Sequence, residues 1–215
     1  MRSSGFKVGL PGGSGVDLVI TFDDGEQNVY QHAFPLLKKY SMKAVIFLIV
    51  DYIGRLNSWD LTLGKELCHL GWNEIHEMHE YGMEFGSHGM SHSNLTKVDN
   101  DVLNHELQKS KQIIEGELGL CRCISYPFNR ANQRVVDLAL SAGYKYGFGG
   151  DGSSLMLIKK EAIYITDTKI NFRIKLNERS PFYAYERMKQ KIINMFTLVT
   201  MLYHPVQHYK GDHHE

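Results

Sequence analysis

Long hydrophobic segments are absent from this sequence of 215 residues. The longest uninterrupted apolar run, residues 44–50, is far shorter than the roughly 20 residues that a helix needs to cross a bilayer. We therefore expect no transmembrane segment. The glycine-rich N-terminal region lacks the apolar core of a signal peptide, which favours a cytoplasmic location.

A surplus of charge of either sign is also absent. Lysine and arginine together number 24, aspartate and glutamate together number 24, and no block of basic residues occurs. Nucleic acids and anionic membranes are bound mainly through clustered positive charge, so neither is expected as the main partner.

Cysteine is scarce, since the sequence has only Cys68, Cys121 and Cys123. The number is odd, the spacing is not one that metal sites use, and two cysteines separated by a single residue form a poor disulfide. We expect reduced thiols, which again favours the cytoplasm.

The sequence does contain a regular alternation of strand and helix patterns. Apolar, β-branched runs predict strands at 16–22, 44–50, 83–86, 123–126, 144–148, 161–165 and 198–203. Helical spacing of apolar residues predicts helices at 29–40, 72–81, 99–118, 132–142 and 182–196. This alternation is typical of parallel βαβ units, and about seven strands suit either an open doubly wound sheet or an incomplete barrel.

Polar residues follow four of the predicted strands and decide between these folds. They are Asp23-Asp24, Ser87-His88, Pro127-Phe128-Asn129 and His204. An open sheet would spread these positions apart, whereas a barrel brings the C-terminal ends of all its strands to one face. We therefore predict an α/β fold with an incomplete (β/α) barrel.

Two of these clusters have the chemistry of a metal site. His88 and His92 stand four residues apart and can face one point, although a chance pair is a competing explanation among 11 histidines. The adjacent carboxylates of Asp23 and Asp24 repel each other, so one needs a cation and the other can then act as a base. Asp-Asp-Gly is also an ordinary turn sequence. A carboxylate with two histidines would leave coordination positions open, as in catalytic metal sites.

Four segments in this order resemble the motifs of the polysaccharide deacetylases, carbohydrate esterase family 4. They are Thr21-Phe22-Asp23-Asp24-Gly25, the segment 85–95, Ser125-Tyr126-Pro127-Phe128 and Leu202-Tyr203-His204. The resemblance implies a distorted, incomplete (β/α) barrel that hydrolyses an N-acetyl group on a sugar with a metal ion. It also implies a lead-in at 1–15, a catalytic domain at 16–206 and a polar tail at 207–215.

The resemblance assigns roles to single residues. Asp24, His88 and His92 match the metal ligands of the family, and Asp23 matches its general base. His204 matches the general acid, with a core histidine as the competing interpretation. The implied cofactor is one divalent ion, zinc first, with cobalt, nickel or manganese as alternatives.

The third motif implies where the acetyl group binds. Tyr126, Pro127 and Phe128 are expected at the substrate, with a backbone N–H near Phe128 facing the oxyanion, although Tyr126 could equally belong to the core. The expected partner is an N-acetylated glycan, such as peptidoglycan, an exopolysaccharide or another surface polysaccharide. The oligomeric state stays open. The alternatives are an amidohydrolase for small molecules, an O-acetyl esterase, or an inactive barrel that binds glycan.

The sequence departs from the family at two points. Many members carry an arginine that braces the base, and Ser125 stands at that position here. We expect Arg173 to replace it, because 170–176 alternates like a strand, with Arg130 as the second candidate and two surface arginines as the competing interpretation. The aspartate that tunes the acidic histidine also has no clear match, and Asp151 and Asp167 are candidates.

Overall fold

The computed structural model describes residues 6–56, 68–177 and 179–202. These residues form two compact units, one of residues 6–56 and 68–160 and the other of 161–177 and 179–202. Within the described ranges, no helix is both long enough and apolar enough to span a bilayer.

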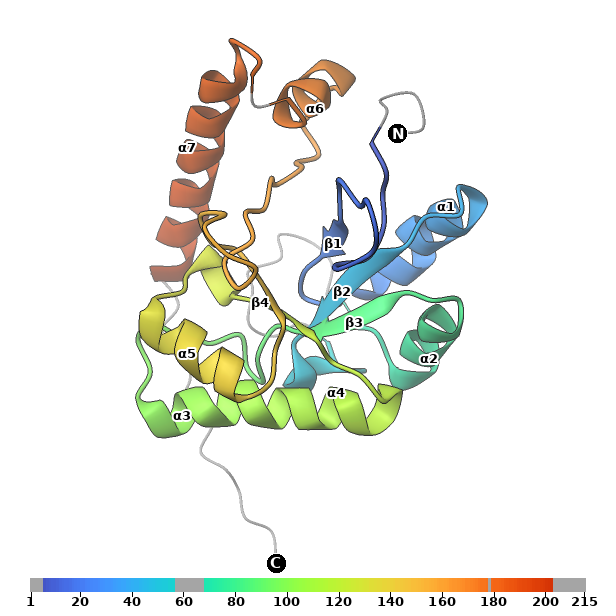
Figure 1. The fold of residues 1–215 in the computed structure, drawn as a ribbon, viewed down its shortest axis with the longest axis vertical. Helices are drawn as coiled ribbons and strands as arrows, with labels where there is room; N and C mark the ends of the chain where they lie inside the picture. The colour runs from blue at the N-terminus through green and yellow to red at the C-terminus, as the bar shows by residue number, and fades with distance from the viewer. Residues whose placement is uncertain (1–5, 57–67, 178, 203–215) are drawn as a thin grey trace, which may run out of the picture. The chain divides into compact units, whose positions relative to one another are not determined.

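The first unit is built on a parallel sheet of five strands in the order β1-β2-β3-β4-β5 (Figure 1). The strands are β1 (Ile20–Phe22), β2 (Ala44–Leu48), β3 (Glu84–Ser87), β4 (Cys123–Ser125) and β5 (Tyr146–Phe148). Each strand pairs with the next one in the sequence, which is the connectivity of a (β/α) barrel opened along one side. The predicted α/β fold with an incomplete barrel is confirmed, with a sheet of five strands among the described residues where about seven were expected.

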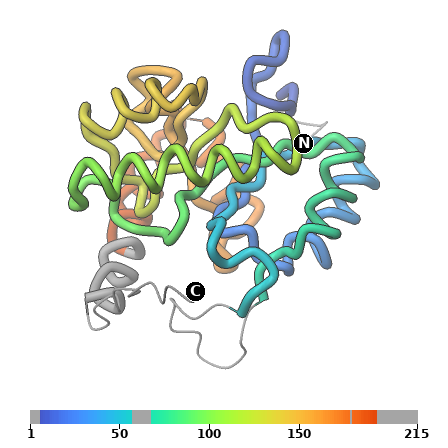
Figure 2. The backbone as a smooth tube through the Cα atoms, turned by 90° about the horizontal axis from the view of Figure 1, so that it is seen from below, coloured from blue at the N-terminus to red at the C-terminus, as the bar shows by residue number. Residues whose placement is uncertain are grey.

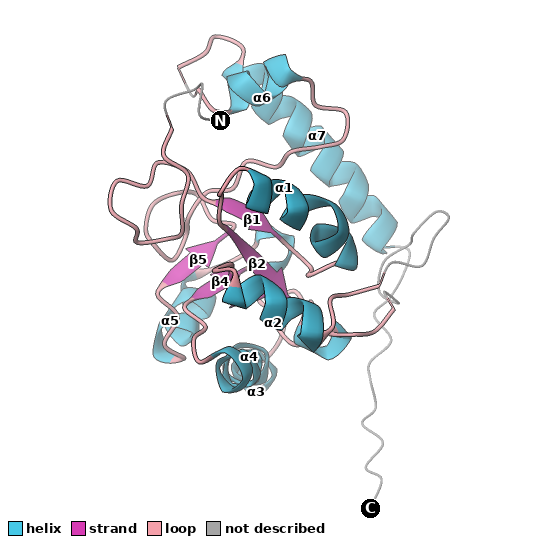
Figure 3. Cartoon of the chain, turned by 90° about the vertical axis from the view of Figure 1, so that its right-hand side faces the viewer, coloured by secondary structure: helices cyan, strands magenta, loops and turns pink. Residues whose placement is uncertain are grey.

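Helices connect these strands and surround them on the outside (Figure 3). They are α1 (Phe34–Lys39), α2 (Trp72–Glu80), α3 (Asn100–Asn104), α4 (Ser110–Leu118) and α5 (Gln133–Ser141). Short 3₁₀ turns lie at Val50–Tyr52 and Pro127–Asn129, and π-helical turns at Val29–Ala33 and His105–Lys109. Figure 2 shows that α3, the second π-helical turn and α4 form one continuous helix.

Local sequence explains where these helices begin and end. Asp99 precedes α3 and accepts a hydrogen bond from the backbone N–H of Val102, and Asn132 caps α5 through Val135 in the same way. Gly119 ends α4 in the left-handed conformation, with φ of 75°. These are the caps that fix the length of each crossover and therefore the end of the following strand.

Strand β2 lies at the centre of the packing, because all of its residues are buried. Its side chains alternate between two layers. Ile46 and Leu48 belong to the large core beneath the helices, whereas Val45 and Phe47 join Cys123 and Phe148 in a smaller cluster on the other side of the sheet. The continuous apolar run at 44–50 is therefore explained by burial on both faces.

The second unit contains α6 (Lys169–Lys175) and α7 (Tyr183–Leu202). Asp167 lies in front of α6 with its side chain 1% exposed, and it forms ion pairs with Lys175 and Lys189. These pairs join the start of α6 to its own last turn and to α7.

Two predicted strands are wrong. Residues 161–165 form no strand, since the backbone N–H of Tyr164 is used in a turn closed by Asp167. The described part of 198–203 is helical, because the apolar run there continues the periodicity of α7 up to Leu202. A short apolar run does not distinguish a strand from a buried helix segment. The strand expected at 170–176 is also a helix, α6.

Two glycines with opposite surroundings test this packing. A Cβ atom on Gly86, in buried β3, would lie 2.7 Å from both the carbonyl oxygen of Cys123 and the ring of Phe47. A Cβ atom on the exposed Gly116 of α4 would meet open space. We expect Gly86→Ala to lower the free energy of unfolding by about 1–3 kcal/mol through overpacking. Gly116→Ala is expected to raise it by about 0.5–1 kcal/mol. Urea denaturation measures both, and equal effects would contradict the packing described here.

Candidate active site

Asp24, His88 and His92 converge at the C-terminal ends of β1 and β3. Each offers one ligand atom, and these atoms all lie within 4.8 Å of one another. The Nε2 atoms of His88 and His92 lie 3.4 and 3.6 Å from Oδ1 of Asp24. The two histidines are not on a helix, since the chain between them turns through Gly89 and His92, both with positive φ.

The protonation of His88 indicates what this cluster is built to bind. Its Nδ1 lies 2.6 Å from the carbonyl oxygen of Ser125, which can only accept, so Nδ1 carries the proton. Burial lowers the pKa of His88 and lowers that of His92 well below its usual value, which favours the neutral form of both rings. The lone pair of His88 Nε2 therefore faces the carboxylate of Asp24, and a cation between them would turn this repulsion into attraction. Two neutral imidazoles and one carboxylate fit zinc or a similar divalent ion.

The loop that carries these histidines is held by the buried carboxylate of Glu106, which is 3% exposed. Oε2 of Glu106 accepts hydrogen bonds from the backbone N–H groups of Met90, at 2.6 Å, and Ser91, at 3.2 Å. Oε1 accepts one from the hydroxyl of Ser91. Glu106 stands in the π-helical turn between α3 and α4. Such turns are frequent at functional sites.

Asp23 has a different partner from its neighbour Asp24. Nζ of Lys160 donates hydrogen bonds to Oδ2 of Asp23, at 2.5 Å, and to Oγ of Ser125, at 2.8 Å. Burial by itself would raise the pKa of Asp23, but the charge of Lys160 and the hydrogen bonds from Lys160 and Ser125 outweigh it and leave the pKa below its usual value. Asp23 is thereby held as a carboxylate.

Sequence reasoning missed Lys160. Arg173 or Arg130 was expected beside Asp23. Arg130 is exposed, and Arg173 lies in helix α6 of the second unit, where a strand was expected. One feature of the sequence could have indicated Lys160. It follows the apolar run 155–158, just as the other polar site residues follow predicted strands. Nothing in the sequence distinguishes it from its neighbour Lys159.

The third motif contributes its backbone and one aromatic ring. The ring centroid of Phe128 lies 4.7 Å from that of His92, and Pro127 is buried beside it. Tyr126 is completely buried in the large core, so its side chain belongs to the packing and not to an open site. Asp24, His92 and Phe128 all have φ between 61° and 69°, a conformation that is costly for residues other than glycine and that clusters at functional sites.

The remaining predicted site residues are placed as follows. His204 lies outside the described residues. Asp151 is exposed and accepts a hydrogen bond from the backbone N–H of Ser153. Asp167 is paired with two lysines of the second unit.

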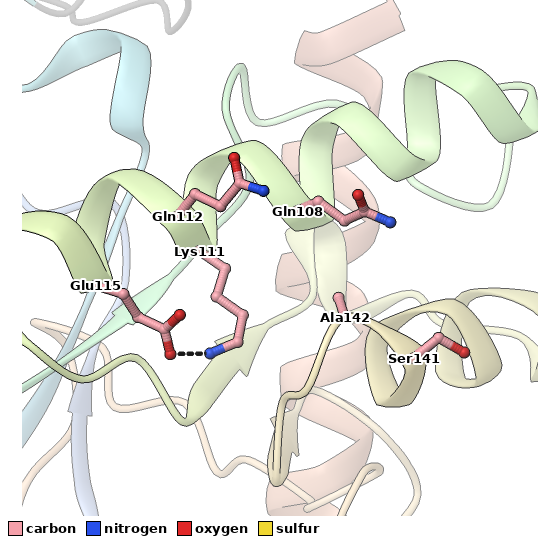
Figure 4. Close-up of a pocket in the computed structure, with 6 residues that line it drawn as sticks. All are labelled: Gln108, Lys111, Gln112, Glu115, Ser141 and Ala142. Atoms are coloured by element: carbon pink, nitrogen blue, oxygen red, sulfur yellow. Dashed lines mark hydrogen bonds and ion pairs between the residues drawn. The ribbon is translucent and has the colours of Figure 1, made fainter.

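A hollow of about 370 Å³ lies on the outer surface between α4 and α5 (Figure 4). Its lining is polar and shares no residue with the cluster around Asp24. The ammonium of Lys111 in this hollow already donates to Glu115 and to the carbonyl oxygen of Cys121.

Loss of the Glu106 carboxylate should loosen the histidine loop. Glu106→Ala leaves the buried N–H of Met90 without its acceptor, so we expect a loss of about 1–3 kcal/mol in the free energy of unfolding. Glu117 is the matched control, since its side chain is 46% exposed and pairs with the exposed His76. Glu117→Ala should change stability by no more than about 0.5 kcal/mol. Chemical denaturation of both variants measures the two losses in free energy of unfolding. Equal losses would show that Glu106 has no special role in holding the histidine loop.

Comparisons with known proteins agree with this geometry. Residues 13–147 match the polysaccharide deacetylase family. The chain is 34% identical over 131 residues to YxkH of Bacillus subtilis (strain 168), covering 60% of this chain and 43% of that protein. It is 30% identical over 139 residues to the poly-beta-1,6-N-acetyl-D-glucosamine N-deacetylase of Staphylococcus aureus (strain MRSA252), covering 60% of this chain and 46% of that protein. The chain thus spans less than half the length of these relatives.

Solved structures share the fold. The Streptococcus pyogenes deacetylase PplD, in complex with acetate, superposes with a TM-score of 0.70 at 23% identity, covering 82% of each chain. IcaB from Ammonifex degensii superposes with a TM-score of 0.58 at 23% identity, covering 68% of this chain and 70% of that one. The match over 13–147, together with the ordered motifs at the strand ends, shows that this chain belongs to the polysaccharide deacetylase family.

Proposed function

We propose that this chain is a metal-dependent hydrolase that removes the acetyl group from an N-acetylated amino sugar of a glycan. The observation that carries the proposal is the pairing of two differently held carboxylates. Asp24 faces two neutral histidines, whereas its neighbour Asp23 is kept ionised by a lysine. One carboxylate is thus suited to a cation and the other to accepting a proton.

Asp24, His88 and His92 would hold the ion. A divalent cation bound there would lower the pKa of water and polarise the acetyl carbonyl. Asp23 then accepts the proton of the attacking water. Its Oδ2 is occupied by Lys160, and its buried Oδ1 accepts no hydrogen bond from the described residues, so Oδ1 is the atom that takes the proton.

The other roles are carried over from the family resemblance. A backbone N–H near Phe128, whose ring packs against that of His92, donates to the oxyanion as the amide carbon becomes tetrahedral. His204 protonates the departing sugar amine, so that cleavage of the C–N bond yields acetate and a free amine. Both roles rest on the family resemblance and on the position of these residues after strands or motifs.

The proposed substrate class is an N-acetylated surface glycan. The Staphylococcus aureus relative is named for a β-1,6-linked polymer of N-acetylglucosamine, and this supports an exopolysaccharide ahead of peptidoglycan. The same scaffold could in principle act on O-acetyl esters or small amides, and the substrate panel below separates these reactions.

Acetate release by the zinc-loaded protein tests the proposal. The panel contains β-1,6-linked N-acetylglucosamine oligomers, chitooligosaccharides, peptidoglycan fragments, O-acetylated sugars and small amides. We expect release from at least one N-acetylated oligomer, with a free amine appearing in equal amount. Release from O-acetyl sugars alone would replace the amide reaction by esterase chemistry, and a metal-bound protein that releases nothing would contradict the proposal.

Two substitutions should distinguish a metal ligand from the general base. His88→Ala removes a ligand, so both bound zinc and acetate release should be lost. Asp23→Asn should keep the zinc and lower kcat by about 10²–10⁴-fold, the usual contribution of a general base. Bound metal is measured by elemental analysis, and His76→Ala, whose side chain is 44% exposed, is the control. Equal loss of zinc in Asp23→Asn would make Asp23 a ligand and not the base.

Substitution of His204 tests its proposed role as the general acid. His204→Ala should lower turnover while leaving the zinc content at the level of the unsubstituted chain, because an acid that serves the leaving group does not touch the ion. A substrate whose departing amine is more acidic should lose less of its rate in this variant. Parallel loss of metal and activity would instead identify His204 as a ligand.

A further inference from the structure

We propose that Lys160 is the positioning residue of Asp23, and that its ammonium, supplied from the segment after β5, takes the place of the arginine that many family members supply from the end of β4. The inference rests on the proposed function, since it concerns how the base of that reaction is held. It adds a residue that stands in none of the recognised motifs.

The contact itself is close and enclosed. Nζ of Lys160 lies 2.5 Å from Oδ2 of Asp23, and the two residues are 137 positions apart in the sequence. The side chain of Lys160 is 14% exposed and that of Asp23 is 34% exposed. A charge-assisted hydrogen bond of this kind, partly buried, fixes one carboxylate oxygen and leaves the other for chemistry.

Ser125 is what allows a lysine to reach this position. Its side chain is fully buried and small, where an arginine would extend toward the base. The hydroxyl of Ser125 accepts a hydrogen bond from Nζ of Lys160, and its carbonyl oxygen accepts the proton of His88 Nδ1. Ser125, at the end of β4, therefore orients both the ammonium of Lys160 and the ring of His88, a histidine of the proposed metal site.

The backbone before Lys160 is anchored along β5. Ile158 forms a parallel bridge with Phe148, and its N–H donates to the carbonyl oxygen of Gly147 at 2.7 Å. This approach requires glycine, because a Cβ atom on Gly147 would lie 2.3 Å from the carbonyl oxygen of Met156. Lys160 follows Ile158 by two residues, so its starting point is fixed by the sheet.

Substitution of Lys160 tests the proposal in the zinc-loaded full chain. Lys160→Met keeps the length of the side chain and removes its charge. We expect kcat to fall by about 10²-fold, since a misplaced group costs about that much, while KM and bound zinc stay within about threefold. Lys145→Met, at an exposed lysine of the same unit, should leave all three unchanged.

Restoring the cation should restore the rate. Lys160→Arg is expected to recover kcat to within about tenfold, because a guanidinium can also donate to both Asp23 and Ser125. Added ethylamine should raise the turnover of Lys160→Ala and not that of Asp23→Asn. Unchanged kcat in Lys160→Met, or a fall in kcat matched by loss of zinc, would overturn the positioning role.

A second measurement separates this inference from the proposed function. In metal-free protein, thermal unfolding is compared for Lys160→Met, Asp23→Asn and the double variant. If the two residues are paired, the shift in Tm of the double variant differs from the sum of the single shifts. Additive shifts would overturn the pairing even in an active enzyme. Failure of the chain to release acetate from any glycan, with coupled shifts, would overturn the proposed function and leave the pairing supported.

Discussion

The repulsion between Asp23 and Asp24 is the constraint on which the rest of the site depends. Two carboxylates on adjacent residues cannot both stay ionised in a partly buried place unless each is compensated. The structure gives them different partners, with the ammonium of Lys160 against Asp23 and two neutral imidazoles, which would share a cation with it, against Asp24. The proposed assignment of Asp23 as base and Asp24 as ligand thus follows from the partner that each carboxylate meets.

The backbone makes this separation possible. Asp24 has φ of 69°, which turns its side chain away from the direction that an extended strand would give it, and Gly25 follows with φ of 68°. A Cβ atom on Gly25 would lie 2.8 Å from the side chain of Leu48, so the turn is also pressed against β2. The strained conformation is maintained because the buried sheet beneath it cannot move.

Local sequence patterns predicted most of the fold and the cluster of Asp24, His88 and His92. Strands, helix caps and motifs can be recognised because each depends on residues that are close together in the sequence. The strands expected at 161–165 and 198–203 failed where a short apolar run is compatible with more than one structure. Lys160 could not be predicted, since its contact with Asp23 joins residues 137 positions apart and depends on how the segment after β5 lies on the sheet. The same limit explains why two arginines were expected instead, Arg173 from the strand-like alternation of 170–176 and Arg130 from its place two residues after Phe128.

The position of Lys160 also bears on how a family can lose a motif residue and keep its chemistry. In a barrel of parallel strands, the C-terminal ends of all strands face one region, so a charge needed there can come from any of several strands. Moving the cation from the end of β4 to the segment after β5 changes its sequence position but leaves a positive charge 2.5 Å from the carboxylate. Ser125, small and hydrogen-bonded to that lysine, then serves as part of the replacement, so its presence in place of arginine does not indicate an inactive barrel.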